Sequence, residues 1–291
     1  MFLRGQFYTG SHWRTAFTVW FAYCLARDMD KQRTLNSISA EVTLRHLAFV
    51  TYSVPAQRVR PHLPRDFLLE TFTDARGQER ALISTGCFLN EDLRWSLVPK
   101  LSMNYHQITF RTYVRYGDRV GAYFFGTDVG SGPAYMLQRS FARNVAWATI
   151  HLKTAHTKDG YDRYSCRVRS VHGETRFKLK ARHRLSEQDE KALAQNITYR
   201  LHGFFESSAR MQADQFVQHK RMTPYSGELV AGRFEFWERM GILTQEESLD
   251  AHSVLIQPSI RFKVFPAVPI KLLFPATAKP PVSSEDERLA A

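Results

Sequence analysis

The chain has 291 residues and a formal net charge of +12, and 44% of its residues are hydrophobic. This composition is typical of a globular protein with a sizeable core, and it excludes a chain that is disordered over most of its length. The three cysteines, Cys24, Cys87 and Cys166, lie far apart in the sequence without metal-ligand spacing. We therefore expect a reducing, cytoplasmic location, no metal site and no cofactor.

The first forty residues are expected to lie outside the folded core. Residues 15–26 form an apolar run between Arg14 and Arg27 that is too short to span a bilayer as a helix. A non-core extension, or a start codon assigned too far upstream, is favoured over a cleaved signal peptide. The sequence predicts a single domain over residues 41–272, and residues 273–291 read as a disordered, low-complexity tail.

Short strand-like segments dominate the predicted domain. In chain order they are residues 44–54, 79–90, 105–116 and 120–127, then WATIHLK, YSCRVRSV, TRFKLKARHR, DQFVQHKRM and SVLIQPSIRFKVFP. NEDLRWSLVPKLSMN is expected to be a long connection. Helices are predicted after Val54-Pro55, over residues 131–144, in SEQDEKALAQNITYRLHGFF and in RFEFWERMGI. The mixture favours a β-rich α+β fold, an antiparallel closed or nearly closed barrel with a few outer helices.

Basic residues alternate along TRFKLKARHR. Period-2 alternation puts five of them on one face of the predicted strand, namely Arg176, Lys178, Lys180, Arg182 and Arg184. A solvated outer strand face is the favoured interpretation. A surface that binds a polyanion or nucleic acid stays open as the alternative, although no nucleic-acid-binding motif accompanies it.

Arg111 lies in the middle of the strand at residues 105–116. Alternation puts it on one face with Tyr105, Gln107, Thr109 and Tyr113, while the hairpin partner strand is apolar on both faces and therefore covered on both. This polar row is predicted to face an enclosed central cavity, where a guanidinium needs a carboxylate, a carbonyl or a bound anion. The alternatives are an Arg111 that extends to solvent or one that pairs with Asp128.

The segments QITFRTYV and GAYFFGTD, with VPAQRVRPHLP before them and YSCRV and FVQHKRM after them, resemble the YqjF-like family of uncharacterised proteins. That family belongs to the acetoacetate decarboxylase-like superfamily, and the resemblance covers about residues 41–270. It implies a β-rich barrel with a central ligand cavity, and it adds Arg167 of YSCRV as a candidate for the pocket wall.

The resemblance does not extend to the decarboxylase chemistry. The decarboxylases use a Schiff-base lysine in a segment that corresponds here to LQRSFARNVAWA, which has no lysine. They also carry a catalytic carboxylate in a Tyr-x-Glu strand, where this chain has Tyr105-His106-Gln107. Because glutamine does not titrate near neutral pH, a decarboxylation through an iminium is not expected.

The leading hypothesis is a barrel that binds a small carboxylate- or carbonyl-bearing metabolite. Arg111 would hold the anion, and Tyr105, Gln107 and Tyr113 would be its hydrogen-bond partners. Arg139, on the helix after the hairpin, could reach the cavity mouth. A lysine-independent reaction on a keto acid and a catalytically dead scaffold both stay open, and the catalytic residues and the oligomeric state are undecided.

Overall fold

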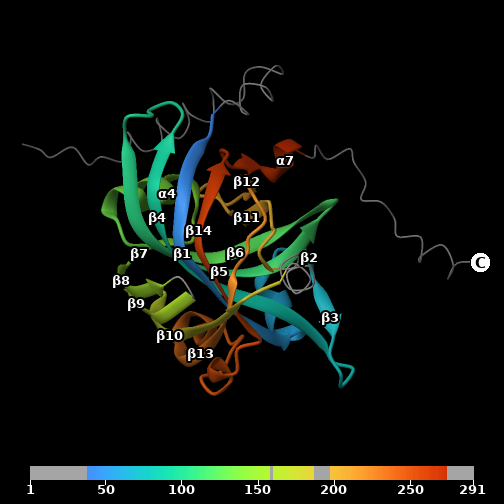
Figure 1. Ribbon diagram of the computed structural model, residues 1–291. Coiled ribbons are helices and arrows are strands. Elements are labelled where there is room, and N and C mark those ends of the chain that lie inside the picture. The colour runs from blue at the N-terminus through green and yellow to red at the C-terminus, as the bar shows by residue number, and fades with distance from the viewer. Residues whose placement is uncertain (1–37, 158–159, 187–196, 274–291) are drawn as a thin grey trace, which may run out of the picture.

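The structure is a computed structural model that describes residues 38–157, 160–186 and 197–273 (Figure 1). Most of the expected N-terminal extension, the expected tail after Leu273, and residues 187–196 of one predicted helix lie outside the described residues. The predicted domain boundaries therefore stay a prediction. Within the described part, the strands join in one sheet and the helices are short.

The first half of the described chain is built from long strands. They are β1 (Ala40–Pro55), β4 (Glu79–Trp95), β5 (Ser102–Tyr116) and β6 (Arg119–Val129), with the short strands β2 (Leu68–Leu69), β3 (Thr71–Thr73) and β7 (Val145–Trp147). The connections hold the helix α3 (Ala56–Val59), the 3₁₀ helix η1 (Arg60–His62) and the helix α4 (Gly132–Phe141). Gly117, at a φ of 57°, forms the predicted turn between β5 and β6.

The second half adds eight strands. They are β8 (Thr149–Thr157), β9 (Gly160–Ser170), β10 (Gly173–Arg184), β11 (His202–Glu206), β12 (Gln212–His219), β13 (Tyr225–Phe234), β14 (Ser253–Val264) and β15 (Val268–Pro269). Three short helical segments complete the described chain, namely α6 (Glu235–Arg239), the 3₁₀ helix η2 (Glu247–Leu249) and α7 (Ile270–Leu273).

Hydrogen-bonded pairing runs through seven strands in an uneven ring. The strands β14, β1, β4, β5 and β6 pair in turn as antiparallel neighbours, β11 joins β6 in parallel, and β12 joins β11. The last link is short, because β12 meets β14 only through residues 217–219 and 262–264. The predicted β-rich fold with few helices is confirmed, whereas the closed barrel stays a prediction.

A second group of strands leaves the ring at β14. We call β13, β10, β9 and β8 the arm; they pair in that order and lie together at the lower left of Figure 1. Strand β14 pairs with β13 through residues 254–256 and with β12 through residues 262–264, and Pro258 lies between the two stretches. Proline has no N–H to donate to a ladder, so it suits the place where β14 changes partners.

Three sequence predictions of secondary structure are wrong. The expected connection NEDLRWSLVPKLSMN is mostly strand, because β4 continues past a bulge near Asp92, whose φ is +56°. The segment HGFF at the end of a predicted helix is strand β11. Strand β13 was not predicted, since its two glycines hide the alternation, and it takes Arg233 and Phe234 from the predicted helix.

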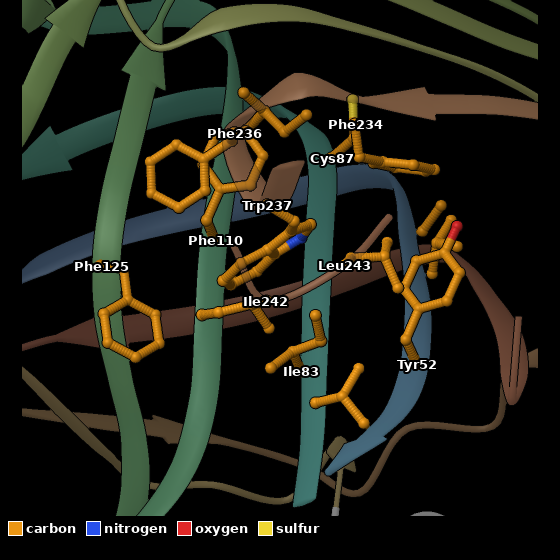
Figure 2. Close-up of a cluster of buried hydrophobic side chains, with 14 of the residues drawn as sticks. Tyr52, Ile83, Cys87, Phe110, Phe125, Phe234, Phe236, Trp237, Ile242 and Leu243 are labelled. Carbon is orange, nitrogen blue, oxygen red and sulfur yellow. The ribbon is translucent and has the colours of Figure 1, made fainter. Parts of the chain in front are cut away.

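Aromatic side chains fill one face of the central strands. Trp237 is fully buried, and its indole Nε1 donates to Thr85 Oγ1 at 2.9 Å. The rings of Phe110 and Phe236 stack with centroids 4.0 Å apart, and Figure 2 shows Trp237 among them with Phe125 close by. Because side chains alternate along a strand, the neighbours of Phe110 on β5 point to the opposite face.

Candidate functional site

The opposite face of the same strands borders a pocket of about 220 Å³. All seven strands of the ring and the helix α4 contribute side chains to its wall, which is mostly aliphatic and aromatic. The polar row of β5 lies in this wall as far as Arg111, with Tyr105, Gln107 and Thr109. Leu137 of α4 also lines the pocket and is 38% exposed, so the pocket reaches the surface beside α4.

Arg111 is half-buried and held at two points. Its Nη2 donates to the Ile197 carbonyl at 2.9 Å, and its guanidinium carbon lies 4.2 Å from the centre of the Phe49 ring. Its Nε is buried without a hydrogen-bond partner among the described residues, where no carboxylate pairs with the group either. Asp128, the predicted alternative partner, instead accepts hydrogen bonds from Ser170 and His172.

A network of amides and one phenol lies at another part of the wall. Gln107 Oε1 accepts from Asn90 Nδ2 at 3.2 Å and from Gln138 Nε2 at 3.1 Å, and Gln138 also donates to the Tyr105 hydroxyl oxygen. These bonds leave the Gln107 amide N–H groups and the Tyr105 hydroxyl hydrogen free to donate to a ligand. Burial raises the pKa of Tyr105 to about 12, against the opposing Gln138 hydrogen bond, so this phenol stays protonated.

A second arginine of the wall has an acid partner. The Arg200 side chain is 6% exposed, and its Nη2 lies 2.6 Å from Glu70 Oε2. Arg111 and Arg200 both contact the Tyr113 ring, with guanidinium carbons 5.6 Å and 5.3 Å from its centre. Of these two cations, Arg200 is neutralised by a carboxylate, and Arg111 has the charge available for an anion.

Two histidines complete the polar part of the wall. His202 of β11 interacts through Nδ1 with the carboxylate of buried Asp214, which also pairs with Arg119. His219, at the end of β12, interacts through Nδ1 with the Lys220 carbonyl at 2.7 Å. Among the described residues the pocket wall contains no lysine, aspartate or glutamate.

The comparisons with known proteins agree with this architecture. Residues 41–260 match the family model DUF2071, described as an uncharacterized conserved protein. The chain belongs to this family. The match covers most of the sequence, and it includes the ring strands β4, β5, β6, β11 and β12 in full. No curated protein matches the chain.

Several solved structures share the fold of this DUF2071 chain. An acetoacetate decarboxylase-like enzyme from Sphingomonas wittichii RW1 is 12% identical, with a TM-score of 0.53 over 80% of this chain and 92% of that chain. Acetoacetate decarboxylase from Legionella pneumophila is 11% identical, with a TM-score of 0.52 over 79% and 87%. The enduracididine biosynthesis enzyme MppR, complexed with pyruvate, is 10% identical, with a TM-score of 0.50 over 80% and 90%. The predicted membership of an uncharacterised family with the acetoacetate decarboxylase-like fold is confirmed.

Three of the six predicted site residues line the pocket and three do not. Arg111, Gln107 and Tyr105 lie together in the pocket wall. Tyr113 is buried beside it, and its hydroxyl forms a hydrogen bond with Ser84 Oγ at 2.7 Å.

Arg139 and Arg167 also lie outside the wall. Arg139 is exposed on α4, whereas Leu137, Gln138 and Phe141 are the residues of this helix that line the pocket. Arg167 is exposed on β9 in the arm, where it lies 3.7 Å from Glu174. Neither residue is among those that line the pocket, and a role for either in ligand binding stays a prediction.

Sequence reasoning missed Arg200, His202 and Gln138 as wall residues. Arg200 and His202 come from a segment predicted as helix, so no alternation was available to place them. His219, at the end of β12, also lies in the wall. The part of the chain that the structure describes has no group of three or more side chains suited to a metal ion. It also has no helix long and apolar enough to cross a membrane.

Proposed function

We propose that the pocket binds a small carboxylate- or carbonyl-bearing metabolite, with Arg111 as its anion clamp. The observation that carries the proposal is the state of the Arg111 guanidinium, which is fixed by Ile197 and Phe49 yet has no acid partner among the described residues. A buried N–H without an acceptor costs about 1–3 kcal/mol, so stability does not explain why an arginine lies here. Nη1, which has no hydrogen-bond partner in the described structure, is the donor that a bound anion would use.

The rest of the wall suits the remainder of such a molecule. Gln107 and Tyr105 offer donors to a carbonyl oxygen, and the aliphatic and aromatic side chains suit a short apolar body. Tyr113 supports the clamp through its ring, which contacts the Arg111 guanidinium. A volume of about 220 Å³ favours a small metabolite over a cofactor or a peptide.

The test is binding of 2-oxo acids, beginning with pyruvate, which the similarly folded MppR holds in its structure. Titration by calorimetry or ligand-observed NMR should show saturable binding, and Arg111→Met should weaken it about 30-fold, the effect of losing one charged hydrogen bond. Arg115→Met is the matched control, since Arg115 lies exposed on the same strand. Equal affinity for the wild type and Arg111→Met, or no binding across a panel of 2-oxo and simple carboxylic acids, would refute the clamp.

We also propose that binding involves no imine. Among the described residues no lysine lines the pocket, which leaves the carbonyl of a bound acid without an amine partner. Sodium borohydride added to the protein with saturating pyruvate should leave the intact mass unchanged. A mass increase that corresponds to a reduced pyruvate adduct would show a reactive lysine and overturn this part.

A second candidate function is the binding of nucleic acid on the exposed face of the arm. The five basic residues of β10 are all exposed, which confirms the predicted outer face. The register adds an observation that the sequence lacked: Arg176 is paired with Arg167 on β9 and with Arg233 on β13. Adjacent strands lie about 4.8 Å apart, so three arginines cross the arm side by side. Arg233 is paired with Glu235 at 2.9 Å and Arg167 lies 3.7 Å from Glu174, so Arg176 is the one of the three without an acid partner among the described residues.

The salt dependence of binding tests this second function. Fluorescence anisotropy with a single-stranded DNA oligonucleotide should give an affinity that falls steeply with salt concentration. Neutralising Lys178, Lys180 and Arg182 together should reduce the slope of log affinity against log salt by about 2, since each lost phosphate contact removes about 0.7. An unchanged affinity and slope in the triple variant would exclude the basic row of β10 as the binding surface.

A further inference from the structure

His219 is a buried histidine with a defined tautomer. It is 8% exposed, its ring stacks on Phe262 with centroids 4.2 Å apart, and Tyr199 contacts it edge-on. The carbonyl oxygen of Lys220 can only accept, so the Nδ1 atom of His219 must donate to it and carry the hydrogen. In the neutral ring Nε2 then has a free lone pair, and no hydrogen bond occupies it among the described residues.

The surroundings keep this imidazole neutral. Burial lowers the pKa of His219, the hydrogen bond to Lys220 opposes that effect, and the nearby charge of Arg111 lowers the pKa further. A neutral imidazole with a bare nitrogen is a proton acceptor at pH 7. His219 therefore combines burial in the pocket wall, a fixed ring and proximity to the proposed anion clamp.

The described wall offers few other bases. It has no aspartate, glutamate or lysine, and Tyr105 stays protonated. His202 is the one other imidazole, and its Nδ1 is committed to Asp214. Of the two histidines, His219 is buried and His202 is only partly buried.

We infer that His219 Nε2 is the general base of this pocket and that the pocket catalyses the reversible enolisation of a 2-oxo acid. The inference rests on the proposed function, because Arg111 must first hold the acid. With its carboxylate on Arg111, the acid would present C3, the carbon next to the carbonyl, to His219.

The step balances without a further reactant. His219 Nε2 takes a proton from C3, the C3–H electron pair forms the C2–C3 double bond, and the carbonyl π pair moves to oxygen. The Arg111 charge stabilises the enolate oxygen. The imidazolium exchanges its Nε2 proton with water and returns a solvent-derived proton to C3, which regenerates the acid. The surface opening beside Leu137 gives water a route for the exchange.

The experiment follows the methyl signal of pyruvate by proton NMR in deuterated buffer. The wild-type protein should accelerate its loss over buffer alone. His219→Asn should slow the catalysed exchange at saturating pyruvate at least 100-fold, the usual contribution of a general base. The asparagine amide can still donate to the Lys220 carbonyl, so the variant should keep the fold. Its dissociation constant for pyruvate should stay within about threefold of the wild-type value.

His106→Asn is the matched control. His106 is half-buried, and burial lowers its pKa as well, but it lies on β5 outside the pocket wall. Its variant should exchange pyruvate at the wild-type rate. Circular dichroism and thermal unfolding of each variant separate a lost base from a lost fold.

The outcomes separate the two proposals. Pyruvate that binds without faster exchange overturns the enolisation and leaves the proposed function intact. Exchange that survives in His219→Asn but disappears in His202→Asn moves the base to the other imidazole and overturns our assignment. If no 2-oxo acid binds to the wild type, both proposals fall together.

Discussion

The two faces of the ring strands differ in what covers them. On one face Ile108 and Phe110 of β5 pack with Trp237 and Phe236 in a filled aromatic core. On the other face the next residue along, Arg111, borders a pocket and leaves its Nε without an acceptor. Hydrocarbon fills the first face, so its residues are explained by stability. The second face contains polar groups that stability does not require, which is why we look there for function.

The largest expected loss of stability comes from a substitution on the filled face. Trp237→Ala should lower the free energy of unfolding by about 3–5 kcal/mol, because it leaves a cavity in the core and removes the partner of Thr85. Urea unfolding followed by circular dichroism measures it. Leu137→Ala, in the pocket wall at its surface opening, should change the free energy by less than about 1 kcal/mol. Similar losses for both variants would mean that the two faces do not differ as we describe.

A smaller effect is expected at the boundary between the faces. Tyr113→Phe removes a hydroxyl from a buried chain that runs through Ser84 to Thr51, with both oxygen-oxygen distances 2.7 Å. It should lower the free energy of unfolding by about 1 kcal/mol. It should leave pyruvate binding within about threefold, because the ring that contacts Arg111 is kept. A large loss of binding instead would make the Tyr113 hydroxyl a direct ligand-binding group.

The smallest expected effect is the pH dependence contributed by His219. Its pKa is lowered in the folded protein, mainly by burial and then by the Arg111 charge, from an ordinary value of 6.5. As the pH falls through 6.5 the unfolded chain takes up this proton first, so stability is complete above that value and declines below it. His46, His106 and His252 contribute with the same sign, since burial lowers the pKa of each. His219→Asn should flatten the decline between pH 7 and pH 5 in urea titrations, and an unchanged slope would contradict the buried, neutral state.

Alternation within one strand made part of the site predictable. The side chains of Tyr105, Gln107 and Arg111 share a face because a strand has a period of two, and the bulge opposite Arg111 lies in the partner strand. The same logic placed the exposed row of β10. These predictions needed only local sequence and the assumption that the strand pairs with its neighbour.

The remaining site residues could not be predicted, because their positions depend on pairing between segments that are distant in the sequence. His219 and His202 reach the pocket because β11 pairs with β6 and β12 with β14, contacts that no local pattern encodes. The cysteines give a second example: Cys87 and Cys166, far apart in sequence, have sulfur atoms 3.2 Å apart in the core. Arg167 is a third example, since sequence alone could not show that β9 belongs to the arm.

Strand β14 is shared by the ring and the arm, with Pro258 at the point where its partners change. Deleting one residue between Ile256 and Ile260 would leave the pairing of β14 with the arm in register. The residues of β14 after the deletion would then point to the opposite face of the sheet, so Phe262 would leave the pocket wall. The spacing between the two ends of this strand is thus under stronger constraint than the identity of most of its residues. In relatives of this chain, β14 should vary in composition long before it varies in length.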